Sequence, residues 1–472
     1  MLKTLRFIPF FLIALGIDAQ TVRFQTTFGG IDVVLTPTTT PLTVANFMNY
    51  VDSGAFSNTI FHRSLSPSAA SAAPPYIIQG GGYVLGPANI PVLYGPLNPP
   101  VTNEFNSASC PCNILGTLAM ALTASSIDSG TNQWYFNLSD NASSFDSGDY
   151  TVFGNIANNA SLAVANNINA LNTWSVDFGQ DADFANLPLQ NYSCPNPTCP
   201  LVQMANYVFV NSIGPITAPT VTAAGVADAA TSSNNSKMGI SPGEIITLYG
   251  SNWNTTTPSY MGPSLPPGQA VTLTLDSAGS VNTNLDGTQV TFNGVPGAMD
   301  FTTDEQIAVV VPYEIAGQST VNVVVSYLGG SSSSMQFNVV PTTPGLFTLN
   351  QAGSGDAAII RLSDASVISA SNPASVGDFL ELYGEGYGVA TPSTSLPDGA
   401  VVGSVLPVPA ATTVLMIDGQ PVATQYAGGA GGDVNGVMQV NFTVPQLAPG
   451  SHQIQVKVGS AVSPAGVTLA TK

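Results

Sequence analysis

Positive charge is what this sequence has least of. It contains 8 Lys and Arg residues against 27 Asp and Glu residues, which gives a formal net charge of −19. Proteins that bind nucleic acids or anionic lipid surfaces use clustered Lys and Arg side chains to contact phosphates. The composition therefore argues against nucleic acid as a partner and provides no attraction to an anionic membrane. We interpret the acidity as a source of solubility.

Histidine is equally scarce, since His62 and His452 are the only two and lie in distant parts of the chain. A metal site rich in histidine, or a Ser-His-Asp arrangement, is therefore not expected within one domain. The acidic residues do not follow a calcium-loop pattern, and the glycine-rich residues 428–436 do not have phosphate-loop spacing. The sequence predicts neither a cofactor nor a metal.

Long hydrophobic runs are also missing, because the longest apolar stretch covers only residues 7–17. It follows Lys3 and Arg6 and precedes Ala19, which is the pattern of a secretory signal peptide cut after residue 19. An N-terminal anchor helix is the alternative, but the run is shorter than a membrane span and no second one follows. We expect an exported protein that is periplasmic, on the cell surface or secreted, and monomeric.

Cysteine is limited to Cys110, Cys112, Cys194 and Cys199. An exported protein can form disulfides, and four cysteines allow three pairings. A bridge within residues 110–112 would be strained at the Cα separations that disulfides prefer. We therefore expect Cys110 and Cys112 to pair with Cys194 and Cys199, in an order that stays open. A zinc site is the rival interpretation, which the oxidising compartment and the lack of nearby His disfavour.

The residues that are abundant predict a β-rich globular protein. Hydrophobic residues make up 44% of the chain, with 46 Gly and 36 Pro, and charged residues only 7%. Disordered chains have the opposite balance. At about 150 residues per domain, 472 residues suggest about three domains. Strand-like runs dominate residues 20–215: they are 22–24, 31–35, 76–79, 116–122, 134–138, 151–153 and 207–210.

Two helical segments interrupt these strands. Residues 43–53 place Val44, Phe47, Met48 and Val51 at helical spacing, and residues 161–171 show a similar pattern. Several short strands with two helices predict a small closed barrel that is capped at its ends. The following residues 216–237 are rich in Ala, Thr, Ser and Asn without a clear period, so we expect a linker there.

Beyond residue 237 the sequence repeats itself. Residues 241–250 (SPGEIITLYG) match residues 375–384 (SVGDFLELYG), and residues 306–312 (QIAVVVP) match residues 439–445 (QVNFTVP). The offsets between matching positions are 134 and 133 residues, so the segment is a duplication. Short strands alternate with turn residues in each copy, as in a β-sandwich.

The duplicated region resembles the Ig-like IPT/TIG repeats of secreted bacterial proteins. We expect one sandwich at residues 238–345 and a second at residues 346–472. Such modules are expected to provide spacing or attachment to a surface partner, which the sequence does not identify.

Arg63 stands out because only Arg23 shares its charge between residues 20 and 215. It belongs to the motif Phe61-His62-Arg63, which is followed by Gln79 in a glycine-rich segment. Further motifs are residues 43–47 (TVANF), 116–121 (GTLAMA), 132–136 (NQWYF) and 150–154 (YTVFG). These motifs and their order resemble the cyclophilins, which are peptidyl-prolyl cis-trans isomerases. The resemblance implies an eight-stranded closed β-barrel with two capping helices for residues 20–215, ahead of the two sandwiches.

The resemblance also implies an active site. Arg63 would hydrogen-bond the prolyl nitrogen of a twisted X-Pro bond, and Gln79 would hold the substrate backbone and Arg63 itself. A proline-containing polypeptide would be the substrate. By motif position, the residues that contact it would be Phe61, Tyr76, Ile77, Ala121, Tyr135, Phe145 and Tyr150. The reaction moves no proton, so His62 is expected to be structural.

Two departures from the family pattern leave a second hypothesis open. Residues 64–75 form an insertion directly after Arg63, and Tyr135 stands where phenylalanine is usual, which adds a hydroxyl to the pocket. The alternative function is therefore a weakly active or inactive protein that binds proline-containing segments. In that case the Ig-like modules would mediate adhesion or assembly.

Overall fold

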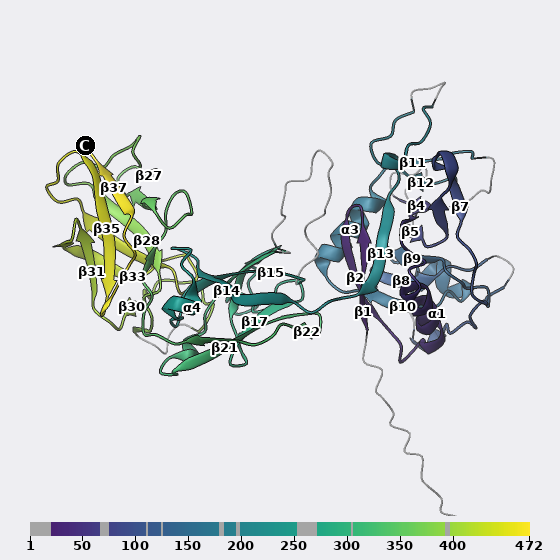
Figure 1. The fold of residues 1–472 in the computed structure, drawn as a ribbon, viewed down its shortest axis with the longest axis horizontal. Helices are drawn as coiled ribbons and strands as arrows, with labels where there is room; N and C mark the ends of the chain where they lie inside the picture. Colours follow the sequence, from purple (N-terminus) through teal and green to yellow (C-terminus); the bar gives the residue numbers. More distant parts are fainter. Residues whose placement is uncertain are drawn as a thin grey trace, which may run out of the picture. The chain divides into compact units, whose positions relative to one another are not determined.

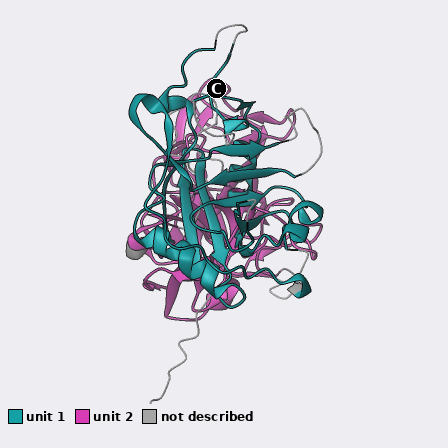
Figure 2. Cartoon of the chain, turned by 90° about the vertical axis from the view of Figure 1, so that its right-hand side faces the viewer, with its two compact units in different colours: residues 1–157, 161–215, 258–260 teal, residues 158–160, 216–257, 261–472 magenta. Residues whose placement is uncertain are grey.

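A computed structural model of the chain describes residues 20–66, 75–109, 112–123, 126–178, 184–194, 199–252, 271–303, 305–391 and 397–472. These residues form two compact units (Figure 2). The barrel unit contains the described residues up to 157 together with those of 161–215. The sandwich unit contains residues 158–160 and the described residues from 216 onward. No helix in the described part of the chain is long and apolar enough to cross a membrane.

The barrel unit is built around one mixed-length sheet, in which the strands pair in the order β4-β5-β9-β8-β10-β2-β1-β13-β3-β6-β7 (Figure 1). Its strands are β1 (Thr21–Thr26), β2 (Gly29–Leu35), β3 (Thr59–Ile60), β4 (Arg63–Leu65), β5 (Ile77–Gly80), β6 (Tyr83–Leu85), β7 (Pro91–Leu93), β8 (Thr117–Met120), β9 (Trp134–Asn137), β10 (Val152–Ile156) and β13 (Phe209–Pro215).

Alternation of side chains turns one face of this sheet inward. In β1, Val22 and Phe24 are fully buried while their neighbours are partly exposed, which is the period-two pattern of a half-buried strand. Trp134 lies at the centre of the core, and its ring contacts the rings of Phe24 and Phe136 at 4.9 and 5.5 Å between centroids. This aromatic core fixes the positions of β4, β5 and β9, which carry the predicted site.

Two helices complete the core, as the sequence predicts: α1 (Pro41–Asp52) and α3 (Asn159–Asn169). In Figure 1 they lie apart, with strands of the sheet between them. Proline suits the first turn of α1, where the free N–H groups of Leu42 and Thr43 donate instead to the Glu104 carboxylate at 3.0 and 2.7 Å. The apolar faces of both helices join the same buried cluster.

The chain segment 59–65 contributes β4 at one end of the pairing order and β3 close to the other end. Only Phe61 and His62 separate β3 from β4. β3 pairs with β6, and β4 pairs with β5. Because the order contains eleven short strands, the expected count of eight and the closure of the barrel remain predictions. The remaining elements of this unit are α2 (Ala142–Phe145), β11 (Thr173–Trp174) and β12 (Leu187–Pro188).

The disulfide that the structure describes corrects the pairing expected from the sequence. Cys194 is bonded to Cys199, with their Cα atoms 4.4 Å apart. The expected pairing with Cys110 and Cys112 is therefore wrong for both of these residues. A separation of five residues lets one local loop bring the two cysteines together. Cys112 is also disulfide-bonded, and Cys110 lies outside the described residues.

The sandwich unit begins earlier than the sequence suggests. Residues 216–237 are not a plain linker, because β14 (Thr220–Asp228) lies within them and pairs with β15 (Ile245–Ser251). Val221 and Val226 of this strand are buried in the first sandwich core. The many small Ala and Thr side chains of this segment give little contrast between buried and exposed positions, so the sequence shows no clear strand period. Strand preference depends on packing against the neighbouring strand, which the local sequence does not contain.

Two separate apolar cores define the two expected sandwiches. The first contains the sheets β14-β15-β20-β19-β16 and β18-β17-β21-β22, with β23 beside β21. Its further strands are β16 (Val271–Thr272), β17 (Thr288–Phe292), β18 (Val295–Pro296), β19 (Ala298–Thr302), β20 (Gln306–Val310), β21 (Thr320–Tyr327), β22 (Gly330–Ser331) and β23 (Met335–Asn338), and the short helix α4 (Asn235–Met238) precedes β15.

The second sandwich has the sheets β27-β26-β28-β34-β33 and β25-β37-β35-β31-β32. Its strands are β24 (Gly345–Leu346), β25 (Gly355–Asp356), β26 (Ile359–Arg361), β27 (Ser366–Val367), β28 (Phe379–Glu385), β29 (Ala390–Thr391), β30 (Val408–Pro409), β31 (Thr413–Ile417), β32 (Gln420–Val422), β33 (Thr424–Gly429), β34 (Met438–Thr443), β35 (Gly450–Val458), β36 (Ala461–Val462) and β37 (Val467–Thr471).

The duplication extends to strand register. Tyr249 lies opposite Gln306 in the first sandwich, and the matching Tyr383 lies opposite Gln439 in the second. The two copies therefore share strand pairing as well as sequence pattern.

Candidate active site

Three polar side chains form a hydrogen-bonded row across β4, β5 and the start of β9. Arg63 lies opposite Gln79 in the sheet, and its Nη1 donates to Gln79 Oε1 at 3.5 Å. Gln79 Nε2 in turn donates to Gln133 Oε1 at 2.9 Å. The Gln79 side-chain oxygen accepts from Arg63 and its side-chain nitrogen donates to Gln133, so the two bonds fix the orientation of the amide group. The oriented amide group in turn holds the Arg63 guanidinium in place. All three side chains are partly buried.

Gln133 is a member of this row that the sequence argument did not single out. It stands inside the quoted motif of residues 132–136, directly before the buried Trp134. Its backbone carbonyl also accepts the N–H of Ala121, one of the predicted contact residues, at 3.0 Å. The signal available in the sequence was only its place in that motif.

An apolar cluster lies beside the polar row, because Tyr135 pairs directly with Gln79 across β9 and β5. The cluster has Ile77, Ala119 and Tyr135 as its buried members, and Ala121, Phe145 and Tyr150 pack against it. The rings of Tyr135, Phe145 and Tyr150 contact one another with centroids 5.2 to 6.0 Å apart. Five of the seven predicted contact residues therefore come together here: Ile77, Ala121, Tyr135, Phe145 and Tyr150.

The Tyr135 hydroxyl points into the protein. It donates to Asn113 Oδ1 at 2.8 Å, and burial raises the pKa of Tyr135 well above its usual value of 10. Asn113 is fully buried, and its Nδ2 donates to Asp146 Oδ1 at 2.8 Å and to the Tyr150 carbonyl at 3.1 Å. Asn113 thus ties one wall of the cluster to its rim, a role that no sequence motif indicated.

Two predicted contact residues lie elsewhere. Phe61 is fully buried in the barrel core, with its ring edge-on to Trp134 at 5.6 Å, so its predicted substrate contact is corrected. Phe61 lies between β3 and β4, outside both strands, so the alternation along β4 that places Arg63 does not extend to it. Tyr76 is partly buried and packs against the barrel core, and Asn141 Nδ2 donates to its carbonyl at 3.0 Å.

His62 has the surroundings of a structural residue. Its side chain is 1% exposed, and its ring lies 4.8 Å from the ring of Tyr83. No group of three or more His, Cys, Asp or Glu residues that could hold a metal ion occurs in the part of the chain that the structure describes. The site therefore consists of the polar row and the apolar cluster.

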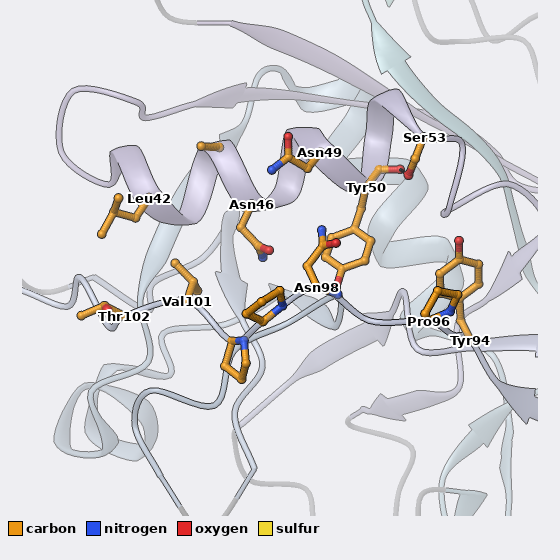
Figure 3. Close-up of a pocket in the computed structure, with 13 residues that line it drawn as sticks. Leu42, Asn46, Asn49, Tyr50, Ser53, Tyr94, Pro96, Asn98, Val101 and Thr102 are labelled. Atoms are coloured by element: carbon orange, nitrogen blue, oxygen red, sulfur yellow. Dashed lines mark hydrogen bonds between the residues drawn. The ribbon is translucent and has the colours of Figure 1, made fainter.

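A neighbouring groove contains none of these residues. It has a volume of about 750 Å³ and lies between α1 and residues 94–102 (Figure 3). Asn98 donates its N–H to the Tyr50 hydroxyl at 2.7 Å at its base. Its lining, as far as the described residues go, contains amides, hydroxyls, prolines and apolar groups without a charged side chain. It therefore offers no group comparable to Arg63.

Comparison with known families agrees with this geometry. Residues 21–185 match the family model described as cyclophilin type peptidyl-prolyl cis-trans isomerase/CLD, and residues 231–339 match the IPT/TIG domain. The chain contains a cyclophilin-type domain. An IPT/TIG domain follows it, and the polar row and the apolar cluster both lie within the cyclophilin-type domain.

Several relatives share this domain. Peptidyl-prolyl cis-trans isomerase A of Dickeya dadantii is 36% identical over 121 residues, which cover 26% of this chain and 55% of that protein. Peptidyl-prolyl cis-trans isomerase B of Escherichia coli is 35% identical over 120 residues, which cover 25% of this chain and 63% of that protein. The chain thus spans little more than half the length of these curated relatives.

A crystal structure of a Cryptosporidium parvum cyclophilin, in the presence of the dipeptide Ala-Pro, covers 41% of this chain and 97% of its own. It is 18% identical to this chain, with a TM-score of 0.28.

Proposed function

We propose that the cyclophilin-type domain is a peptidyl-prolyl cis-trans isomerase that acts on proline-containing polypeptides. The observation that supports this most is the hydrogen-bonded row Arg63-Gln79-Gln133 beside the apolar cluster around Tyr135. A charged donor next to an apolar surface is what an X-Pro bond requires, because the proline ring is apolar and its amide is polar. The names of the relatives agree with this function.

The proposed mechanism uses hydrogen bonding alone. The X-Pro amide rotates over a barrier of about 18–20 kcal/mol, because the C–N bond has partial double-bond character. In the twisted state the prolyl nitrogen loses conjugation and becomes a better acceptor. A guanidinium that bonds this nitrogen in the twisted state more strongly than in the planar state lowers the barrier. Arg63 would provide the donor, and the Gln79 amide would keep it in place.

The substrate contacts follow from the arrangement of the cluster. Ile77, Tyr135 and Phe145 would receive the proline ring, and Ala121 would leave room for the polypeptide to pass. Tyr150 would lie at the rim, where its ring contacts Phe145. The substrate backbone would bond Gln79, which lies between Arg63 and the cluster.

We further propose that the protein is exported and folds clients outside the cytoplasm. Support comes from the signal-peptide pattern of residues 1–19 and from a disulfide in the barrel unit. Residues 1–19 themselves lie outside the described residues. The sandwiches would then act as spacers or attachment modules for an isomerase that works at a distance from its anchor point.

The alternative of a proline-binding protein without activity has less support than the sequence suggested. One reason for it was the additional hydroxyl of Tyr135, but this hydroxyl is bonded to Asn113 and does not enter the cluster. The second reason was the insertion after Arg63, and residues 67–74 of it lie outside the described residues.

The test is a coupled proline-isomerisation assay with a chromogenic X-Pro peptide and the full chain. Arg63→Ala should lower kcat/KM at least about 100-fold, which is typical for the loss of one transition-state donor. Lys457→Ala, which removes an exposed cation of the sandwich unit, is the matched control and should have no effect. Equal catalysed rates for Arg63→Ala and the unchanged protein would exclude the proposed role of Arg63, and no activity in the unchanged protein would exclude this function.

A further inference from the structure

The first sandwich has a sheet with two apolar faces. Along β15, Ile246 and Leu248 point into the sandwich core and are fully buried, whereas Ile245, Thr247 and Tyr249 alternate with them on the outer face. An antiparallel sheet usually presents polar side chains on its outer face. Here part of that face is covered by the second sandwich, through the packing of Phe347 and Val434 near Ile245. The rest of it lies open.

The open part forms a groove, which we call the outer-face groove. It has a volume of about 810 Å³ and is lined by Tyr249, Leu273, Leu275 and Phe301 of the first sandwich and by Val401 and Val434 of the second. Tyr249, Leu273 and Leu275 are 50, 41 and 50% exposed. Large apolar side chains that are exposed together indicate a binding surface, whereas single ones need no explanation.

Carboxylates line the same groove without a cation. Asp300 and Asp433 both belong to its lining, and burial raises the pKa of each above its usual value. No Lys, Arg or His occurs among the described residues that line the groove, and no ion pair in the described part of the chain includes either residue. Asp300 is partly buried and Asp433 is exposed. A partly buried carboxylate without a cation is costly, and a positively charged ligand would offset that cost at Asp300 and pair with Asp433 beside it in the lining.

We propose that the outer-face groove binds a polypeptide segment that carries apolar side chains together with Lys or Arg. The apolar walls would bury the aliphatic side chains, and Asp300 and Asp433 would pair with the cation. The volume lies within the range of about 300–1,000 Å³ typical of ligand pockets, so it holds a short segment rather than a folded domain. A second copy of this chain fits poorly, because each copy has a net charge of −19 and only 8 cationic residues. Binding here is independent of the isomerase proposal.

The experiment measures binding of fluorescein-labelled dodecapeptides to the full chain by fluorescence anisotropy. The probe peptide contains Leu, Val and two Arg residues and no proline, so that it does not address the cyclophilin-type domain. Two further peptides replace either the two Arg by Glu or the Leu and Val by Ser. The protein variants are the double substitution Leu273→Ser with Leu275→Ser, and the double substitution Asp300→Asn with Asp433→Asn.

The cationic apolar peptide should bind, and both replacement peptides should bind at least about tenfold more weakly, a difference of about 1.4 kcal/mol. The leucine double variant should lose about tenfold in affinity, because the substituted side chains would no longer be buried by the ligand. The aspartate double variant should bind more weakly and show a smaller dependence on salt. Leu362→Ser, an exposed leucine outside the groove, and Asp52→Asn, an exposed carboxylate of the barrel unit, are the controls and should bind as the unchanged protein does.

Three results would overturn the proposal. These are no binding of the cationic apolar peptide, equal binding of the Glu-substituted peptide, or equal binding by the leucine double variant and the Leu362→Ser control. Analytical sedimentation of the unchanged protein and of the leucine double variant tests whether a second copy of this chain occupies the groove. A dimer that the leucine substitutions dissociate would assign the groove to a second copy and would also overturn the proposal.

Discussion

The sandwich unit buries three carboxyl groups together, and their protons should make its stability depend on pH. Asp228, Glu244 and Glu385 are 2, 0 and 0% exposed. Both oxygens of Glu385 accept backbone N–H groups, from Ala230 and Ile245. None of the ion pairs among the described residues involves these three groups. Three neighbouring carboxyl groups that are buried without a cation cannot all carry a negative charge, so the cluster retains protons.

The informative substitution is Asp228→Asn. Asp228 Oδ1 accepts the N–H of Thr231 at 2.7 Å. Its Oδ2 is buried and accepts no hydrogen bond from an N–H of the described residues. The Asp228 carboxyl group also lies within hydrogen-bond reach of the Glu385 carboxyl group. An asparagine keeps the first contact through its own oxygen. Its Nδ2 then donates to Glu385, which reproduces the carboxyl pair with one shared proton. Glu385→Gln is less suitable, because both oxygens of Glu385 accept backbone N–H groups and the new amide N–H would face one of these donors.

The magnitude follows from the pKa of Asp228. Burial raises this pKa from 3.8 to about 6, so the folded protein holds the proton more tightly than the unfolded chain. The free energy of unfolding therefore falls as the pH rises from about 4 to about 6, by about 3 kcal/mol. Burial, together with the charge of Asp228, also raises the pKa of Glu244 to about 8, which extends the fall toward higher pH. Asp228→Asn removes the loss of stability that the Asp228 carboxyl causes. It also reduces the loss that Glu244 causes, because the charge of Asp228 no longer raises the pKa of Glu244.

The assay is calorimetric unfolding of the full chain at several pH values between 4 and 8. Between pH 4 and pH 7 the unchanged protein should lose stability in the transition of the sandwich unit, and Asp228→Asn should lose about 3 kcal/mol less. The exposed Asp52→Asn serves as the control and should leave the profile unchanged. Parallel profiles for Asp228→Asn and the unchanged protein would refute the reasoning.

Two further substitutions test contacts of the barrel unit, and urea unfolding measures both. Asp32→Asn should destabilise by about 3 kcal/mol, because the Asp32 carboxylate is fully buried and bonds Arg23 at 2.7 and 3.0 Å, so the substitution leaves a partly buried charge without its counter-ion. A loss below about 0.5 kcal/mol would contradict this. Tyr135→Phe should destabilise by about 1 kcal/mol through the lost bond to Asn113 and should leave the isomerase rate within a few-fold; a rate loss as large as that of Arg63→Ala would show that the hydroxyl acts in the reaction.

The predictions that succeeded rest on local patterns. Both barrel helices begin and end within two residues of the predicted ranges, since apolar residues at helical spacing must face one core. The duplicated segments share strand register, with Tyr249 opposite Gln306 and Tyr383 opposite Gln439. Motif order placed Arg63 beside Gln79, and adjacent strands do bring them together. For the helices the information lies within a few neighbouring residues.

The predictions that failed depend on which segments meet in space. The buried position of Phe61 and the strand within residues 216–237 are of this kind, whereas the Cys194–Cys199 bond closes within one local loop. Asn113 is also of this kind, because its bonds to Tyr135 and Asp146 span 22 and 33 residues. No local period records such contacts.

The turns at residues 241–244 and 375–378, which correspond in the two sandwiches, show what the sequence determines and what the tertiary structure determines. In both copies the carboxylate three residues after a serine accepts the N–H of that serine, Glu244 from Ser241 and Asp378 from Ser375. The sequence by itself determined this turn, since the contact closes within four residues. Only the tertiary structure decided the charge state, because Asp378 meets Arg361 at 2.8 Å whereas Glu244 is buried close to Asp228 and Glu385. Charge depends on the surrounding dielectric and on the nearest partners, and packing sets both.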